Sequence, residues 1–149
     1  YQVAPEVFTG LVLTLVDVSH LRQTQLELNQ QSQLLTSLMR AIPDGYILID
    51  TNGCMQDVNP AIFDLLGYAR EELLGENVSK LMPEEIAAQH DGYLNQYLHT
   101  GAAHIMGYGR RVEAQHSSGH SVPLDLTVSE VRSAEQSWFA GILRKPLKD

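Results

Sequence analysis

The chain has 149 residues, of which 44% are hydrophobic, and its formal net charge is −8. This length fits one domain with an extension, and the negative charge argues against nucleic acid or an anionic membrane surface as a partner. No run approaches the roughly 18 apolar residues of a membrane-spanning helix. The single cysteine, Cys54, excludes an internal disulfide and a cysteine zinc cluster and agrees with a cytoplasmic setting. Since the sequence opens on Tyr1, we expect a piece of a longer protein.

The N-terminal part is predicted to be a strand followed by a long helix. Residues 7–16 are apolar and β-branched, which is typical of a buried strand. From residue 18 to residue 42 the pattern changes to a heptad repeat, which Pro43 ends. The repeating apolar residues are Leu21, Leu28, Leu35 and Ile42, and the second row is Thr24, Gln31 and Leu38. This seam predicts a parallel homodimer through the helix, weakened by the polar residues of the second row.

A pair of strands and a short helix come next. Residues 45–50 and 54–59 alternate as strands do, and the sequence TNG between them favours a tight turn. Asn59 is predicted to cap the helix that follows, with Pro60 in its first turn. Gly67 ends that helix.

The rest of the chain predicts more helix and then three strands. Residues 69–83 should form another short helix and a loop, and residues 84–101 a longer helix. Residues 103–145 read as three antiparallel strands, in which Trp138 is expected to pack in the core. Two strands, several helices and three strands indicate an α+β domain with helices on one face of an antiparallel sheet.

The predicted helix over residues 84–101 carries a histidine among apolar side chains. His90 shares one side of the helix with Ile86, Tyr93, Leu94 and Tyr97. An imidazole in such surroundings must find a hydrogen-bond partner or bind something. Gly92 either bends the helix or allows a flat ligand to approach its backbone. Spacing alone leaves both interpretations open.

One internal similarity bears on domain organisation. FTGLVL at residues 8–13 resembles FAGILR at residues 139–144. Either this is coincidence between strands, or residues 1–17 are the last strand of an upstream copy of the domain. In the second interpretation residues 18–42 are a linker helix, residues 43–145 the domain, and residues 146–149 a tail.

The region from about residue 34 to residue 145 resembles a PAS sensor domain. The residues that carry the resemblance are Gly53, Val58, Asn59, Ala61, Gly67 and Tyr68, followed by LLG at residues 73–75. DVS at residues 17–19 looks like the motif with which a PAS domain passes into its C-terminal linker helix. The resemblance implies a PAS fold, in which a five-stranded antiparallel sheet and its helices enclose a pocket for a cofactor or small ligand.

Within PAS domains, residues 82–131 look most like the FixL-type haem-binding oxygen sensors. That resemblance implies haem b, with His90 of HDGY as the axial iron ligand and Tyr93 and Tyr97 on the same wall. It places the distal, oxygen-binding arginine at Arg110 and a propionate contact at His104. The apolar roof of the distal pocket falls on Ile105, Leu126 and Val128. Two departures are Gln96, where the family has a propionate-contacting arginine, and Tyr108, where it has an aliphatic residue.

The function implied is gas sensing rather than catalysis. A diatomic gas, oxygen first, would bind opposite His90, and the dimeric linker helices would relay the change to an output domain such as a kinase or a cyclic-dinucleotide enzyme. Two alternatives stay open: a cofactor-free dimerisation and relay module, and a PAS domain that holds flavin or a small metabolite. His116 and His120 share a loop but lack a third ligand for zinc. Of the cationic residues near the helix, His99 and Arg111 are further candidates to hold the propionates.

Overall fold

A computed structural model describes residue 10, residues 14–100 and residues 109–147. The chain divides into two units, residues 1–35 and residues 36–149. The strand predicted over residues 7–16 lies mostly outside the described residues, and residues 14–16 have no regular secondary structure.

The predicted long helix is confirmed as α1, Ser19–Ala41. Just before it, the Asp17 Oδ1 accepts a hydrogen bond from the Ser19 amide at 2.9 Å and so pairs one of the free N–H groups of the first turn. The apolar heptad positions Leu21, Leu28 and Leu35 are 67%, 61% and 59% exposed. These residues of the seam are therefore not buried by other residues that the structure describes. No described helix combines the length and apolar character needed to cross a membrane.

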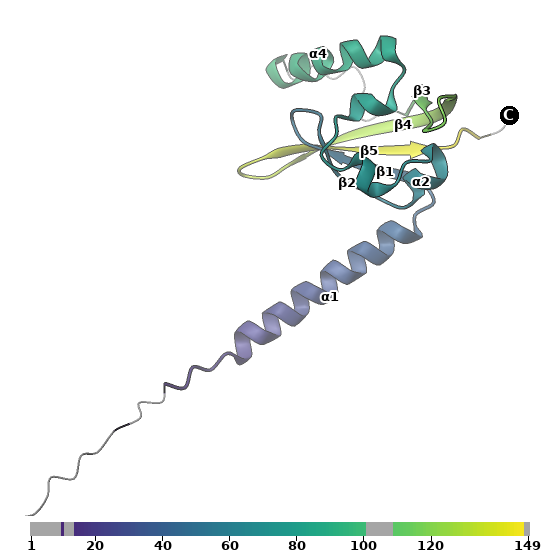
Figure 1. Cartoon of the computed structure of the whole chain (residues 1–149). Coiled ribbons are helices and arrows are strands. Elements are labelled where there is room, and N and C mark those ends of the chain that lie inside the picture. The colour runs from purple at the N-terminus through teal and green to yellow at the C-terminus, as the bar shows by residue number, and fades with distance from the viewer. Residues whose placement is uncertain (1–9, 11–13, 101–108, 148–149) are drawn as a thin grey trace, which may run out of the picture. The chain divides into compact units, whose positions relative to one another are not determined.

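The predicted five-stranded antiparallel sheet is also confirmed (Figure 1). Its strands are β1 (Gly45–Ile49), β2 (Met55–Val58), β3 (Arg110–Gln115), β4 (Ser121–Arg132) and β5 (Ser137–Arg144). Their order across the sheet is β2-β1-β5-β4-β3, so the first and last strands of the domain are neighbours. Gly45 lies opposite Leu143, and the adjacent Asp44 and Arg144 form an ion pair at 2.7 Å.

Helices cover one face of this sheet and bury the core against it. They are α2 (Ala61–Leu66), α3 (Arg70–Leu73), the 3₁₀ turn η1 (Val78–Leu81) and α4 (Glu84–Thr100). The largest side chains removed from solvent are Met55, Ile62, Leu66, Leu73 and Leu124, each of which contributes about 1.5–3 kcal/mol by burial. α2 approaches β1 so closely that a Cβ on Gly45 would lie 2.6 Å from Ile62 Cδ1.

Asn59 does not cap α2, contrary to the prediction. The cap position falls on Pro60 without a side-chain bond, because the Asn59 side chain is used elsewhere. Its Oδ1 accepts from the Tyr46 amide at 2.8 Å, and its Nδ2 donates to the carbonyls of Met39 and Asp44. This buried amide therefore joins the end of α1 to the start of β1.

The expectation that Trp138 packs in the core is wrong. On β5 it is Phe139 that is buried, while Trp138 is half-exposed opposite Val131. Successive strand residues point to opposite faces, so the two neighbouring aromatic side chains cannot share the core.

Candidate functional site

Strand register places three predicted site residues on the helix-covered face of the sheet. Leu126 of β4 lies opposite Arg110 of β3 on one side and opposite the core residue Leu143 on the other. Val128 lies two residues further along β4, on the same face. Arg110 therefore points from the same sheet face as the predicted apolar roof, at the exposed start of β3.

Arg111 points the other way and is not placed to hold a propionate on this face. It lies opposite Asp125 and forms an ion pair with it at 3.2 Å. His99, the other described candidate, is exposed on α4, where its Nδ1 is 2.8 Å from the carbonyl of Asn95. The propionate contact that the resemblance assigns to His104 lies outside the described residues, as does Ile105 of the pocket roof.

α4 is attached to the sheet through Tyr97. The Tyr97 ring meets Phe139 of β5 edge to face at a centroid distance of 5.5 Å, and its hydroxyl donates to Glu130 Oε2 of β4 at 2.6 Å. Arg132 also binds that carboxylate, and these hydrogen bonds, from Arg132 first and Tyr97 second, lower the pKa of Glu130 to about 2. Tyr97 thus anchors α4, and part of the predicted ligand wall already packs on protein.

The predicted wall on α4 does not form one continuous surface. Leu94 and Tyr97 pack toward the core, whereas Ile86 and Tyr93 are 47% and 52% exposed. The Tyr93 hydroxyl donates to Gln89 on its own helix at 2.9 Å. Gly92 is exposed, and a Cβ built there would meet nothing within 4 Å among the described residues.

His90 lies on α4 with one ring nitrogen that lacks a hydrogen-bond partner among the described residues. Its side chain is 21% exposed, and its Nδ1 is buried without a hydrogen-bond partner in the described part of the chain. Such an orphaned nitrogen costs about 1–3 kcal/mol in the folded protein. Burial lowers the pKa of His90, and the nearby Asp91 carboxylate opposes this only in part. The ring is thus kept in the neutral form, which is the form that binds a metal.

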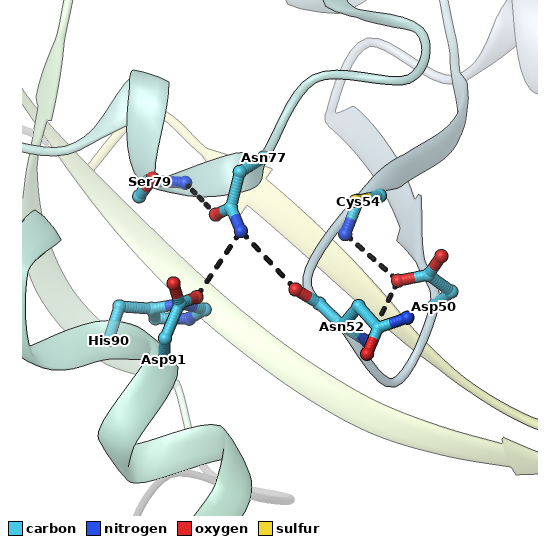
Figure 2. Close-up of polar contacts among 7 residues, drawn as sticks. All are labelled: Asp50, Asn52, Cys54, Asn77, Ser79, His90 and Asp91. Atoms are coloured by element: carbon cyan, nitrogen blue, oxygen red, sulfur yellow. Dashed lines mark hydrogen bonds and ion pairs between the residues drawn. The ribbon is translucent and has the colours of Figure 1, made fainter.

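Asp91, next to His90, belongs to a polar cluster that sequence reasoning missed. Figure 2 shows Asn77 at its centre, with its Nδ2 directed at Asp91 and at the Asn52 carbonyl. The Asn77 Oδ1 accepts from the Ser79 amide at 2.9 Å and caps η1. Asn77 precedes Asp91 by 14 residues and Asn52 precedes Asn77 by 25, so the three residues share no helix or strand and no local pattern marks the cluster.

A second missed feature is an open hollow of about 470 Å³ between the start of α4 and the β3–β4 hairpin. Its lining residues are Ser79, Lys80, Met82, Pro83, Glu84, Gln115, Gly119 and Ser121. None of them is a predicted site residue. The hollow is open to solvent and does not include His90, so it is not part of the candidate site around that ring.

The histidines of the β3–β4 hairpin form a pair without a metal set. His116 and His120 stack at a centroid distance of 4.4 Å, and both Nδ1 atoms lie within 2.9 Å of Ser118 Oγ. No group of three His, Cys, Asp or Glu side chains suited to a metal ion occurs among the described residues. A haem iron needs fewer protein ligands, because its porphyrin supplies the rest.

The sequence profile of the family described as PAS fold matches residues 33–145. The chain belongs to the PAS family. This PAS domain is 33% identical over 129 residues to the sensor protein FixL of Bradyrhizobium diazoefficiens, covering 87% of this chain and 26% of that protein. It is 27% identical over 100 residues to the oxygen sensor protein DosP of Escherichia coli, covering 67% of this chain and 12% of that protein. The chain is therefore a PAS domain similar to a small part of each of these longer proteins.

Solved structures agree with the fold. The PAS domain of an HTR-like protein from Haloarcula marismortui superposes with a TM-score of 0.68 at 20% identity, covering 84% of this chain and 99% of that one. A domain of a sensor histidine kinase/response regulator from Geobacter sulfurreducens gives 0.62 at 23% identity, over 79% of this chain and 96% of that one. At these identities the likeness concerns the fold alone.

Proposed function

We propose that this PAS domain binds haem b through the imidazole of His90 and senses a diatomic gas, oxygen in the first place. The observation that carries the proposal is the largely buried His90 ring, whose Nδ1 has no hydrogen-bond partner among the described residues, on a helix that packs against the same sheet face as Leu126 and Val128. The similarity to FixL, a sensor protein, and to DosP, an oxygen sensor protein, supports the direction of the proposal.

Each predicted residue then has a physical task. The iron of haem supplies a coordination position for the gas. His90 holds the group in place, while Leu126 and Val128, with Ile105, exclude water from it. Arg110 would donate a charge-assisted hydrogen bond, worth about 1.5–3 kcal/mol, to a partly negative gas ligand. Tyr93 and Tyr97 line the side of His90, and His104 serves a propionate.

The signal is proposed to leave the domain through its helices. α1 pairs with the α1 of a second copy along the heptad seam, and the change at α4 reaches the sheet through Tyr97. The parent protein would be a cytoplasmic or membrane-anchored sensor with an output domain such as a kinase or cyclic-dinucleotide enzyme. Residues 1–17 would then be the last strand of an upstream PAS domain.

A second candidate is a cofactor-free PAS domain that only dimerises and relays. One observation favours it: Leu94 and the Tyr97 ring already pack on the core, so protein atoms occupy part of the face that haem would need. In this case the His90 ring is simply a partly buried polar group.

Optical absorption distinguishes these functions. Protein produced with adequate haem should be red, with a Soret band that His90→Ala removes. His20→Ala is the control, since His20 is an exposed histidine on α1 with no role in the candidate site. A yellow preparation would point to flavin, and a colourless protein that takes up no added haem would point to the relay module.

A further inference from the structure

We propose that Asp91 is the hydrogen-bond acceptor for His90 Nδ1–H in the cofactor-loaded domain, and that Asn77 is the positioning residue that holds Asp91 for this role. The inference deepens the proposed function and rests on it, since it assigns the partner of the proposed axial ligand. It makes Asp91 and Asn77 part of the site although neither would touch the cofactor.

His90 and Asp91 are neighbours on α4 whose side chains lie slightly too far apart for a hydrogen bond. Asp91 Oδ1 lies 3.9 Å from His90 Nδ1, about 1 Å beyond hydrogen-bonding distance. The Nδ1 atom is shielded from solvent and has no partner in the part of the chain that the structure describes. Closing this gap of about 1 Å would satisfy the orphaned nitrogen.

The side-chain amide of Asn77 is fixed in one orientation by its hydrogen bonds. Its Oδ1 accepts from the Ser79 amide, so its NH₂ group must point to the opposite side. There it donates to the Asn52 carbonyl at 3.2 Å and to Asp91 Oδ1 at 3.3 Å. If the amide were flipped, its oxygen would face two other acceptors, the Asn52 carbonyl and the Asp91 carboxylate. The hydrogen bonds therefore allow only one orientation of the Asn77 amide.

The backbone of the β1–β2 turn lies close to this amide. The Val78 amide donates to the Gly53 carbonyl at 2.8 Å, which ties the segment of Asn77 to the β1–β2 turn. At Gly53, with φ of +84°, a Cβ would lie 3.2 Å from Asn77 Nδ2 and 3.5 Å from Asp91 Oδ1. The turn therefore comes within contact distance of both side chains, and its glycine leaves them room.

The chemical consequence concerns the ring nitrogens of His90. A histidine that binds a metal generally donates its second N–H to a carboxylate, which fixes the tautomer and makes the ligand more basic. A proton held on Nδ1 by Asp91 leaves the lone pair of Nε2 available for iron. The Asn77 bond favours the Asp91 rotamer that faces the β1–β2 turn and His90.

Two substitutions test this. Asp91→Asn removes the charge with little change of shape. Asn77→Asp keeps the oxygen that caps η1 but replaces the donor to Asp91 with a repelling carboxylate. Asp64→Asn, at an exposed position of α2, is the matched control.

Nitrogen-15 spectra of the cofactor-free protein report the His90 tautomer, and resonance Raman spectra of the ferrous loaded protein report the iron–histidine stretch. In the cofactor-free protein we expect both test variants to shift the His90 proton from Nδ1 to Nε2. In the loaded protein we expect them to lower the iron–histidine stretching frequency and to weaken haem affinity roughly 10- to 100-fold. The control should behave as wild type.

The results separate this inference from the proposed function. If wild type takes up haem through His90 and both variants keep its tautomer and stretching frequency, the inference is overturned. If wild type takes up no haem, the proposed function fails and the role of Asp91 at iron fails with it. A tautomer shift in the variants would then still support the pairing of Asp91 with His90 Nδ1.

Discussion

Tyr97 on α4 donates its hydroxyl proton to Glu130 on β4 at 2.6 Å, across 33 residues of sequence. The bond joins the helix that carries His90 to the strand that carries Leu126 and Val128. Arg132 binds the same carboxylate at 2.7 and 2.9 Å, so the acceptor stays ionised. A displacement of α4 would therefore change a charged contact on the sheet.

The first prediction concerns acid stability. The pKa of Glu130 falls from 4.5 to about 2 on folding, so its stabilising contribution is present above pH 4.5 and is lost as pH falls through 2. Glu130→Gln should be less stable than wild type at neutral pH, and the difference should vanish near pH 2. Thermal unfolding over a pH series measures it, with the exposed Glu135→Gln as control. A difference that persists at pH 2 would refute the assignment.

The second prediction concerns Asn59, which is 5% exposed and bonds to three backbone groups. Asn59→Ala leaves these groups without partners and should lower the free energy of unfolding by about 2–4 kcal/mol. Asn95→Ala, at an exposed position of α4, should stay within about 0.5 kcal/mol of wild type. Denaturant unfolding provides both values, and equal losses would contradict the role of the Asn59 amide.

The third prediction concerns assembly through α1. Leu28 belongs to the heptad seam and is 61% exposed, while Leu26 is 56% exposed but lies off the seam. Leu28→Lys should shift the protein from dimer to monomer, because it places charges face to face in the seam, and Leu26→Lys should not. Light scattering after size exclusion measures the mass. A wild-type monomer, or equal effects of both substitutions, would exclude this seam.

The fourth prediction concerns the two adjacent arginines of β3, which lie on opposite faces of the sheet. In haem-loaded protein Arg110→Ala should release oxygen roughly 10- to 100-fold faster, since it removes a charge-assisted hydrogen bond. Arg111→Ala should release it at the wild-type rate, because Arg111 pairs with Asp125 on the other face. Stopped-flow release of oxygen compares the two, and an unchanged rate for Arg110→Ala would remove Arg110 from the pocket.

Local patterns predicted the elements of this fold well, because heptad spacing, strand alternation and the residues TNG act over a few neighbours. They failed where distant backbone competes for a side chain. Asn59 has the chemistry of a helix cap, yet the carbonyls of Met39 and Asp44 take its amide group. Trp138 and Phe139 are both large aromatic residues, and the register of β5 decides which of them is buried.

The candidate site shows the same division between local and distant effects. The position of His90 on a helix followed from the periodicity of its neighbours in sequence. The contact of Asp91 with Asn77, and the approach of Gly53 to both, arise only when the β1–β2 turn lies against α4. The family resemblance therefore indicated the candidate ligand, and spacing placed it on a helix, whereas the residues that position its neighbour became visible only in the folded domain.

The pairing of β1 with β5 has a mechanical consequence. The chain enters the sheet at Gly45 and leaves it at Arg144, and Gly45 faces the adjacent Leu143 across antiparallel strands. Tension applied through the flanking segments would pull at one end of this ladder and open its hydrogen bonds one after another, starting beside the ion pair of Asp44 and Arg144. The domain should therefore yield to a small stretching force, as an unzipping sheet does, rather than resist it as strands sheared along their length would.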